Sequence, residues 1–281
     1  MAQPTVLAQP AGAAAGDGDF QAGSMKLQNK TILITGASSG IGCELARQLA
    51  HESNRLILIA RRDDLLRQLA STIPAHPHDH ITFQCDVSDA DQVKDICDWL
   101  ISAGIDIDAL ILNAGVNSGF NIRAIDLATF QQQMQVNFFG AVSFVAHLVP
   151  QMIDRQSGII AVTGSLAGYR GVPGAAAYSS SKGALMNFID SIRIDLQKNN
   201  IQCTLISPGF VKTPMTDKND FIMPFMIPVE KAATIIIRGL ERRKTEIRFP
   251  WRMSTAARLG RRLPDALYAR IMQNGRKKRC E

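Results

Sequence analysis

Short apolar runs of four to seven residues alternate along the chain with longer stretches whose apolar residues lie three or four positions apart. The runs are Thr31–Ile34, Arg55–Ala60, Ile81–Gln84, Ala109–Leu112, Ile159–Thr163 and Ile201–Ser207. A continuous apolar run is typical of a strand buried on both faces of a parallel sheet, and the wider spacing is typical of amphipathic helices. The alternation predicts an α/β fold with one doubly wound parallel sheet and helices on both of its faces.

A glycine-rich segment, Gly36-Ala-Ser38-Ser39-Gly40-Ile41-Gly42, follows the first run and precedes a stretch of helical spacing, Cys43–Ala50. Glycines in a strand-to-helix turn let a dinucleotide approach the backbone, and the N–H groups of a helix N-terminus bind its pyrophosphate. The spacing differs from G-x-G-x-x-G, and the lack of a following Gly-Lys-Ser/Thr excludes a P-loop. The alternative is a loop that only turns the chain.

A second motif, Tyr178-Ser-Ser-Ser-Lys182, lies in the predicted helix Ala175–Leu196. Residues four apart share a helix face, so the phenol and the ammonium lie side by side. An adjacent ammonium is expected to lower the pKa of a phenol from about 10 toward neutrality, where it can exchange a proton. Ser165 follows a predicted strand, at the sheet end where open α/β folds bind ligands. An isolated Tyr/Lys pair can equally be a surface pair, but the serine and the glycine segment favour catalysis.

Together these motifs resemble the short-chain dehydrogenase/reductase superfamily, in its one-domain branch with a Rossmann-like fold. Further similarities are Asn113-Ala114-Gly115 after a strand, Asp86-Val87, Asn137 in Val-Asn-Phe-Phe-Gly, and Ser207-Pro208-Gly209-Phe-Val211-Lys-Thr213. The resemblance implies an oxidoreductase that interconverts a carbonyl and an alcohol, with Asn137, Ser165, Tyr178 and Lys182 as its catalytic residues. The expected cofactor contacts are Gly36, Ser38, Ser39, Gly40, Ile41, Gly42, Arg61, Arg62, Asp86, Val87, Asn113, Ala114, Gly115, Tyr178, Lys182, Pro208, Gly209, Val211 and Thr213.

The residues after the second strand bear on the choice of cofactor. Arg61 and Arg62 precede the first acids there, Asp63 and Asp64. A carboxylate at this point accepts from the ribose 2′-OH of NAD, whereas guanidinium groups suit a 2′-phosphate. The sequence therefore favours NADP(H) over NAD, the alternative being two solvated arginines that open a helix.

The segment Asn219–Pro228 lies where the resemblance places a substrate lid, and it is rich in Phe, Met and Ile. Such side chains suit apolar ligands, which favours a lipophilic carbonyl or alcohol (fatty-acyl, steroid-like or prenyl) over a sugar. The lid can alternatively pack on the fold or on a partner subunit. A protein that binds NADPH as a sensor or scaffold, with little catalysis, is the alternative function, and the complete set of catalytic residues argues against it.

Composition is that of one ordinary domain, with 46% hydrophobic and 6% aromatic residues among 281. Five cysteines without a C-x-x-C spacing favour a reducing, cytoplasmic location. The cluster His76-Pro-His78-Asp-His80 is expected to be an exposed loop, and no metal is predicted. The resemblance implies a homodimer or homotetramer formed through the long helices, Phe130–Arg155 and the Tyr178 helix.

The two ends of the chain differ from residues 25–250, which are predicted to form the Rossmann-like domain. Residues 1–24, rich in Ala, Gly, Gln and Pro, are expected to be disordered and not a signal peptide. From Arg248 onward there are ten Lys or Arg and two acids, a net charge of +8, against 21 basic and 23 acidic residues before it. Within this tail an apolar stripe recurs every four residues, formed by Leu259, Leu263, Leu267 and Ile271.

Residues 251–281 are therefore predicted to be a basic amphipathic tail, split into two helices at Pro264. Such a tail suits an anionic membrane surface, and the enzyme would then be cytoplasmic and peripheral. Packing of the stripe on the fold or on a neighbouring subunit is the equal alternative. Nucleic acid is not expected as a partner, because the basic run is confined to one end and has no aromatic platform.

Overall fold

The computed structural model describes residues 25–219 and 221–277. The strands are β1 Thr31–Thr35, β2 Arg55–Ala60, β3 Ile81–Gln84, β4 Ala109–Leu112, β5 Gly158–Thr163, β6 Ile201–Pro208 and β7 Glu246–Phe249. The helices are α1 Gly40–Ala50, α2 Asp63–Thr72, α3 Ala90–Ser102, α4 Leu127–Met134, α5 Gly140–Asp154, α6 Ala176–Leu196, α7 Val229–Glu241, α8 Trp251–Arg262 and α9 Asp265–Lys277. Short turns η1 Gln135–Phe139, η2 Leu166–Gly168 and η3 Gln197–Asn199 join some of them.

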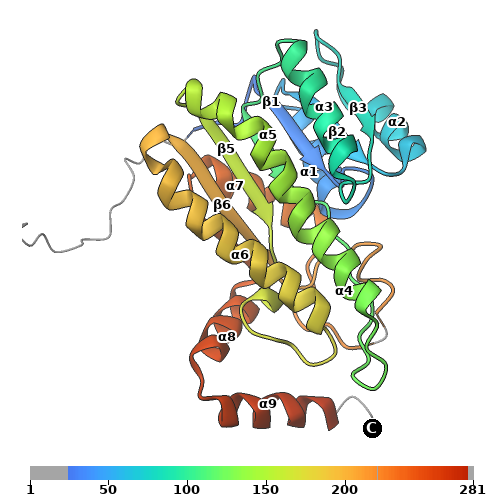
Figure 1. Ribbon diagram of the computed structural model, residues 1–281, viewed down its shortest axis with the longest axis vertical. Helices are drawn as coiled ribbons and strands as arrows, with labels where there is room; N and C mark the ends of the chain where they lie inside the picture. The colour runs from blue at the N-terminus through green and yellow to red at the C-terminus, as the bar shows by residue number, and fades with distance from the viewer. Residues whose placement is uncertain (1–24, 220, 278–281) are drawn as a thin grey trace, which may run out of the picture.

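The seven strands form one parallel sheet in the order β3-β2-β1-β4-β5-β6-β7. The direction of winding reverses between β1 and β4, which makes the ends of these strands the switch point where doubly wound sheets bind ligands. Helices α5 and α6 cross one face of the sheet, and α1 and α7 lie behind it (Figure 1). The predicted fold class is therefore confirmed.

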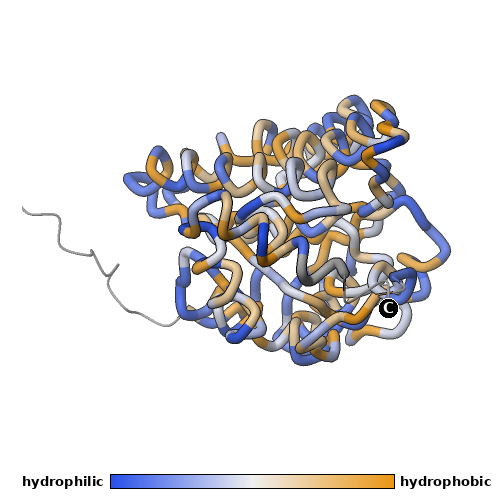
Figure 2. The backbone as a smooth tube through the Cα atoms, turned by 90° about the horizontal axis from the view of Figure 1, so that it is seen from below, coloured by the Kyte–Doolittle hydropathy of each residue, from blue (hydrophilic) through white to orange (hydrophobic). Residues whose placement is uncertain are grey.

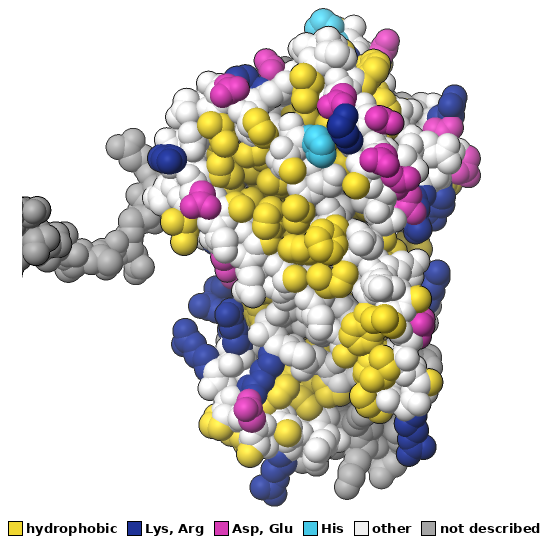
Figure 3. Space-filling view, in the orientation of Figure 1, with side chains coloured by type: hydrophobic (Ala, Val, Ile, Leu, Met, Phe, Trp, Pro, Cys, Tyr) yellow, Lys and Arg dark blue, Asp and Glu magenta, His cyan; other side chains and the backbone are white. Residues whose placement is uncertain are grey.

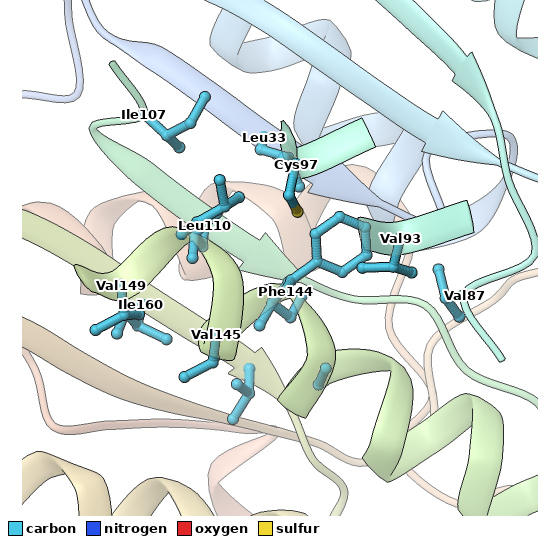
Figure 4. Packing of buried hydrophobic residues seen from close by; sticks show 14 of the residues in the cluster. Leu33, Val87, Val93, Cys97, Ile107, Leu110, Phe144, Val145, Val149 and Ile160 are labelled. Atoms are coloured by element: carbon cyan, nitrogen blue, oxygen red, sulfur yellow. The ribbon is translucent and has the colours of Figure 1, made fainter. Parts of the chain in front are cut away.

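The continuous apolar runs reflect burial on both faces of the sheet. In β1, Leu33 belongs to the core under α3, α5 and α6, whereas Ile32 and Ile34 belong to the core under α1, α2 and α7. Phe144 of α5 lies between Val93 and Leu110, which anchors α5 on its face of the sheet (Figure 4). Seen from below, hydrophobic and hydrophilic stretches of the backbone alternate, as expected when each helix turns one face inward (Figure 2).

The expected long helix over Phe130–Arg155 is three helical pieces, with a π-helical turn, η1, between α4 and α5. Asp126 caps α4 by accepting hydrogen bonds from the backbone N–H groups of Ala128 and Thr129. Among the described residues, Leu127–Asp154 is the one run long and apolar enough to cross a membrane, by length and composition. Half of its most apolar window is buried inside the fold, so covering the sheet accounts for much of its hydrophobicity.

The tail forms two helices, α8 and α9, that separate at Pro264 as predicted. Arg170, in the loop after η2, donates from Nη1 to the carbonyl oxygens of Gly260 and Leu263, each at 2.7 Å. The same guanidinium lies 3.9 Å from the ring centroid of Tyr268, whose hydroxyl donates to the carbonyl of Gly171 at 2.8 Å. This loop thus anchors the junction between α8 and α9 to the fold, while Ser254 in α8 is buried. Residues 1–24, with their predicted disorder, lie outside the described part of the chain.

Candidate active site

The glycine segment makes a tight turn between β1 and α1. Gly36 and Gly40 have φ of +68° and +58°, the left-handed region that side chains other than glycine rarely adopt. A Cβ on Gly42 would lie 2.4 Å from the carbonyl oxygen of Gly36, so the third glycine is needed for the turn to close on itself. We call this turn, Gly36–Gly42, the glycine cradle. It places the N-terminus of α1 at the switch point of the sheet, an arrangement that fits a dinucleotide pyrophosphate.

Two threonines at strand ends hold this cradle against the neighbouring strands. The Thr35 hydroxyl oxygen accepts hydrogen bonds from the backbone N–H groups of Asn113 and Ala114, both at 3.0 Å. The side chain of Asn113 in turn donates to the carbonyl of Thr35 at 3.3 Å and accepts from the Thr163 hydroxyl at 3.2 Å. The sequence motifs assigned neither threonine a role in the site, although each is the polar last residue of an apolar strand.

Beside the cradle lie the two arginines that follow β2. Arg62 donates from Nη2 to the hydroxyl oxygens of both Ser38 and Ser39, each at 2.8 Å. Arg61 lies 3.8 Å from a carboxylate oxygen of Asp86. A cavity of about 440 Å³ is lined by Arg61, Gln84, Asp86 and Gln92. The structure thus brings guanidinium groups and Asp86 together next to the glycine cradle.

Asn137 lies in the π-helical turn with its side chain buried. Its Oδ1 accepts from the backbone N–H of Val116 at 2.7 Å, and its Nδ2 donates to the carbonyl of Val116 and to the Ser181 hydroxyl, both at 2.9 Å. Ser181 donates onward to the carbonyl of Tyr178 at 2.9 Å. Asn137 therefore links the loop after β4 to the helix that carries Tyr178 and Lys182. Ser181 was not predicted as part of the site.

Lys182 is buried, with 3% of its surface exposed, and its ammonium donates to the carbonyl of Thr163 at 2.6 Å. Burial lowers the pKa of this lysine to about 8. A Cβ on Gly115 would lie 3.3 Å from Nζ of Lys182 and 3.2 Å from Oδ1 of Asn137. The glycine leaves room for both side chains to converge at the end of β4.

Tyr178 and Ser165 meet across the ends of α6 and β5. Burial raises the pKa of Tyr178, and a hydrogen bond with the Ser165 hydroxyl acts in the opposite direction. The ammonium of Lys182 lies 5.9 Å from the phenol ring centroid. The expected lowering of the phenol pKa by the lysine is therefore wrong for the protein alone, because desolvation dominates. Adjacent serine and tyrosine hydroxyls can bind one substrate oxygen and exchange a proton with it.

The segment after β6 returns to the glycine cradle. The side chain of Thr213 lies 3.2 Å from the position a Cβ would take on Gly40. Gly209 donates from its backbone N–H to the carbonyl of Phe249 at 2.7 Å, and Val211 forms a β-bridge with Ile227. Pro208 is the last residue of β6. The residues proposed to close over a cofactor thus run across the strand ends beside Ser165.

The histidine cluster lies away from these residues, at the start of β3. Nδ1 of His80 accepts a hydrogen bond from the backbone N–H of Leu56 at 3.1 Å, which ties the loop to β2. Within residues 25–219 and 221–277, no group of three or more His, Cys, Asp or Glu side chains is arranged to hold a metal. Cys43, Cys85, Cys97 and Cys203 are free thiols.

Comparisons with known proteins agree with this arrangement. The family model for short chain dehydrogenases matches residues 30–221. An uncharacterized oxidoreductase of Myxococcus xanthus is 33% identical over 86% of this chain and 96% of its own length. A fatty acyl-CoA reductase of Acinetobacter baylyi is 31% identical over 79% of this chain and 76% of its own length.

Similarity in structure extends over the same region. A short-chain dehydrogenase/reductase from Burkholderia phymatum, solved in complex with NAD, superposes with a TM-score of 0.76 at 23% identity, covering 84% of this chain and 94% of its own. At that identity the likeness concerns the fold, while the family model covers more than half of the chain. The protein therefore belongs to the short-chain dehydrogenase/reductase family of oxidoreductases.

Proposed function

We propose that the protein is an NADPH-preferring oxidoreductase that interconverts a lipophilic carbonyl and its alcohol. The observation that carries this proposal is the convergence of Ser165, Tyr178, Lys182 and Asn137 at the strand ends beside the glycine cradle. In this family the nicotinamide supplies or accepts the hydride. The side chains of this protein then have to hold the substrate oxygen and move a proton.

In the proposed reaction the hydroxyls of Ser165 and Tyr178 hold the substrate oxygen. Tyr178 donates a proton to it in reduction and accepts one in oxidation. Lys182, charged below its pKa of about 8, stabilises the phenolate that remains after donation. Asn137 acts by positioning, because its amide fixes the Val116 loop against Ser181, one turn from the phenol.

The test of this assignment is Tyr178→Phe, which removes only the proton-transferring hydroxyl. We expect kcat to fall by roughly 10²–10⁴. Tyr268→Phe is the matched control. Its hydroxyl donates to the carbonyl of Gly171, where α9 meets the loop after η2, and it has no proposed role in catalysis. Near-normal turnover by the Tyr178 variant on a substrate that the wild type accepts would refute the mechanism. Binding of NADPH with no turnover on any carbonyl would instead support the sensor alternative.

The preference for NADPH is proposed on the two guanidinium groups beside the cradle. Arg62 donates to the hydroxyls of Ser38 and Ser39, and Arg61 borders the cavity next to Asp86. This arrangement supports contact of both guanidinium groups with a 2′-phosphate. The double variant Arg61→Gln/Arg62→Gln is expected to raise the Kd for NADPH at least tenfold and leave that for NADH nearly unchanged. Arg67→Gln, in an ion pair with Asp63 on α2, is the control. An equal loss for both cofactors would contradict the assignment.

The substrate is proposed to be lipophilic because the lid presents apolar side chains. Ile222 and Phe225 are 79% and 50% exposed, and Phe210 and Phe221 stack edge-on with ring centroids 5.9 Å apart. The name of the Acinetobacter baylyi relative, a fatty acyl-CoA reductase, is consistent with a long apolar substrate. A panel of aliphatic aldehydes and ketones of increasing length tests this, and turnover of sugars alone would refute it.

Association and location are proposed with the same function. A homodimer or homotetramer would use the face of α5 and α6, where hydrophobic side chains gather on the surface (Figure 3). Phe139, at the end of η1, and Ile194, on α6, are 48% and 74% exposed. Free thiols suit a reducing cytoplasm. The basic tail suits an anionic membrane surface as a second partner.

A further inference from the structure

Exposed apolar side chains are concentrated at the end of the molecule where the strands terminate. Fourteen large apolar side chains are exposed in the described part of the chain, and ten of them belong to three segments at this end. These ten are Ile122, Ile125, Leu127, Met215, Ile222, Phe225, Trp251, Leu259, Leu267 and Ile271. We call them the mouth face. The start of α4, the segment after β6, and helices α8 and α9 all lie at the lower end of the molecule in Figure 1.

The three segments are far apart in sequence, so the gathering is a property of the fold and not of one amphipathic helix. The tail itself is anchored through Arg170 and Tyr268, yet Leu259, Leu267 and Ile271 remain 61%, 46% and 50% exposed. Docking of the tail on its own fold therefore leaves its apolar stripe largely uncovered. A concentration of exposed apolar side chains of this kind is typical of an interaction site.

Cationic side chains accompany the mouth face. Arg258, Arg261 and Arg262 lie on the side of α8 that borders an open cavity of about 420 Å³, which Asp190 and Glu246 also line. No ion pair joins any of the three to an acid among residues 25–219 and 221–277, and all three are exposed. Arg252 lies 5.7 Å from the ring centroid of Phe225 and 5.3 Å from that of Trp251, which joins the lid to the tail. Figure 3 shows Lys and Arg side chains on both sides of this end, next to hydrophobic ones.

We propose that the mouth face docks on an anionic phospholipid bilayer, and that the lipophilic substrate reaches the active site directly from that bilayer. The second part rests on the proposed function. Apolar side chains would enter the boundary between headgroups and acyl chains, while the arginines pair with lipid phosphates. The lid and α9 lie at the sheet end that carries Ser165 and Tyr178, so the docked face is also the substrate entrance.

Charge selects a lipid surface over a second copy of the chain as the occupant. From Arg248 onward the sequence carries ten basic residues and two acids. A two-fold interface through this face would bring two such tails together, and their like charges would repel. An anionic bilayer instead attracts each of these charges, and salt weakens the attraction without removing the apolar contribution.

The experiment is sedimentation of the full-length protein with vesicles of phosphatidylcholine alone, or of phosphatidylcholine with phosphatidylglycerol. We expect binding to the anionic vesicles only, with affinity that falls as salt is raised. The triple variant Arg258→Gln/Arg261→Gln/Arg262→Gln should bind roughly a hundredfold more weakly, from about 1 kcal/mol per charge at the surface. Lys198→Gln/Arg242→Gln/Lys244→Gln removes three exposed basic residues at the other end of the sheet and should bind as the wild type does.

An apolar pair of variants completes the test. Leu259→Ser/Ile271→Ser, at positions 61% and 50% exposed, should weaken binding in a way that low salt does not restore, whereas Ile194→Ser on α6, 74% exposed, should not. Thermal unfolding of every variant identifies any that lost the fold. Equal, negligible sedimentation with both vesicle types, or equal effects of the mouth and control variants, would overturn the proposal. So would concentration-dependent self-association that the mouth variants abolish, because a second copy would then be the occupant.

Measurements of turnover distinguish a failure of the docking proposal from a failure of the proposed function. With a short, water-soluble carbonyl, the mouth variants should be as active as the wild type, with or without vesicles. With a long-chain substrate embedded in anionic vesicles, they should lose activity in proportion to binding. Vesicle binding without turnover of any carbonyl would refute the enzyme and leave the docking face intact. Turnover of lipophilic carbonyls without vesicle binding would refute the docking face and leave the enzyme intact.

Discussion

Lys182→Met is predicted to make the protein inactive and, at neutral pH, no less stable. The substitution removes a buried ammonium and leaves an apolar side chain of similar length. Burial lowers the pKa of Lys182 from 10.5 to about 8, so the folded protein below pH 8 holds a charge that it hydrates poorly. At about 1.4 kcal/mol per pKa unit, this costs the folded state about 3 kcal/mol at pH 7.

The sign of the pH dependence follows from proton binding. Between about pH 8 and 10.5 the unfolded chain keeps the lysine proton that the folded protein has lost, so wild-type stability gains as pH rises through this window. The methionine variant lacks that gain. Its stability relative to the wild type should therefore fall by about 2 to 3 kcal/mol between pH 7 and pH 10. Other groups titrate in both proteins and cancel in the difference.

One contact opposes the gain at neutral pH. The Lys182 ammonium donates to the carbonyl of Thr163 at 2.6 Å, and the variant leaves that buried oxygen without this donor. An unsatisfied carbonyl costs about 1–3 kcal/mol, so the variant should range from equal in stability to about 2 kcal/mol more stable at pH 7. The cost of the unpaired carbonyl does not depend on pH. The change of the stability difference with pH therefore tests the reasoning better than its value at pH 7.

The assay is urea unfolding of wild type and variant at pH 7, 8, 9 and 10, without cofactor. Lys198→Met provides the control, since the same side chains are exchanged at an exposed position of η3. Its stability difference from the wild type should not change with pH. A difference for the Lys182 variant that is equally flat would refute the reasoning, because the lysine would then be hydrated in the folded protein.

Three further predictions concern the cradle, the converging side chains and the tail. Gly42→Ala places a Cβ 2.4 Å from the carbonyl oxygen of Gly36, and should destabilise the fold by about 1–3 kcal/mol and weaken NADPH binding at least tenfold in a fluorescence titration. Gly171→Ala, with open space around the added Cβ, should leave binding unchanged. Gly115→Ala presses on Asn137 and Lys182, and should lower kcat at saturating NADPH; unchanged kcat would contradict the convergence. Arg170→Ala removes the donor to Gly260 and Leu263, and should speed proteolysis after Arg248, which equal digestion rates would disprove.

Most strands and helices were predictable from local sequence patterns. The strand β6 is buried at every residue, and its apolar run needed no tertiary information to be recognised. The strand β7 was missed, because its four residues include Glu246 and Arg248 and form an edge strand that pairs only with β6. The π-helical turn was missed as well. Nothing in the composition of Gln135–Phe139 distinguishes it from the α-helices on either side.

The residue types of the candidate site were predictable, but the contacts that position them were not. Hydrogen bonds from Asn137 to the Val116 carbonyl and from Lys182 to the Thr163 carbonyl join residues far apart in sequence and use backbone groups, which carry no sequence signal. The direction of the Tyr178 pKa shift was likewise not predictable from sequence spacing. Four-residue spacing brings an ammonium to the phenol, but only the structure reveals that both are desolvated.

The buried ammonium of Lys182 therefore lowers the stability of the folded protein at neutral pH, although the proposed chemistry needs it. An apolar residue in this pocket would suit the folded state better at neutral pH, because nothing anionic among the described residues pairs with the ammonium and its partner is a neutral carbonyl. Such conflicts between local stability and placement are expected at functional sites. If the charge serves a bound NADPH, the stability penalty of Lys182 should shrink when the cofactor is added. The pH slope of unfolding, measured with saturating NADPH, would then shift its midpoint upward from about 8, and an unchanged midpoint would mean that the ammonium does not interact with the bound cofactor.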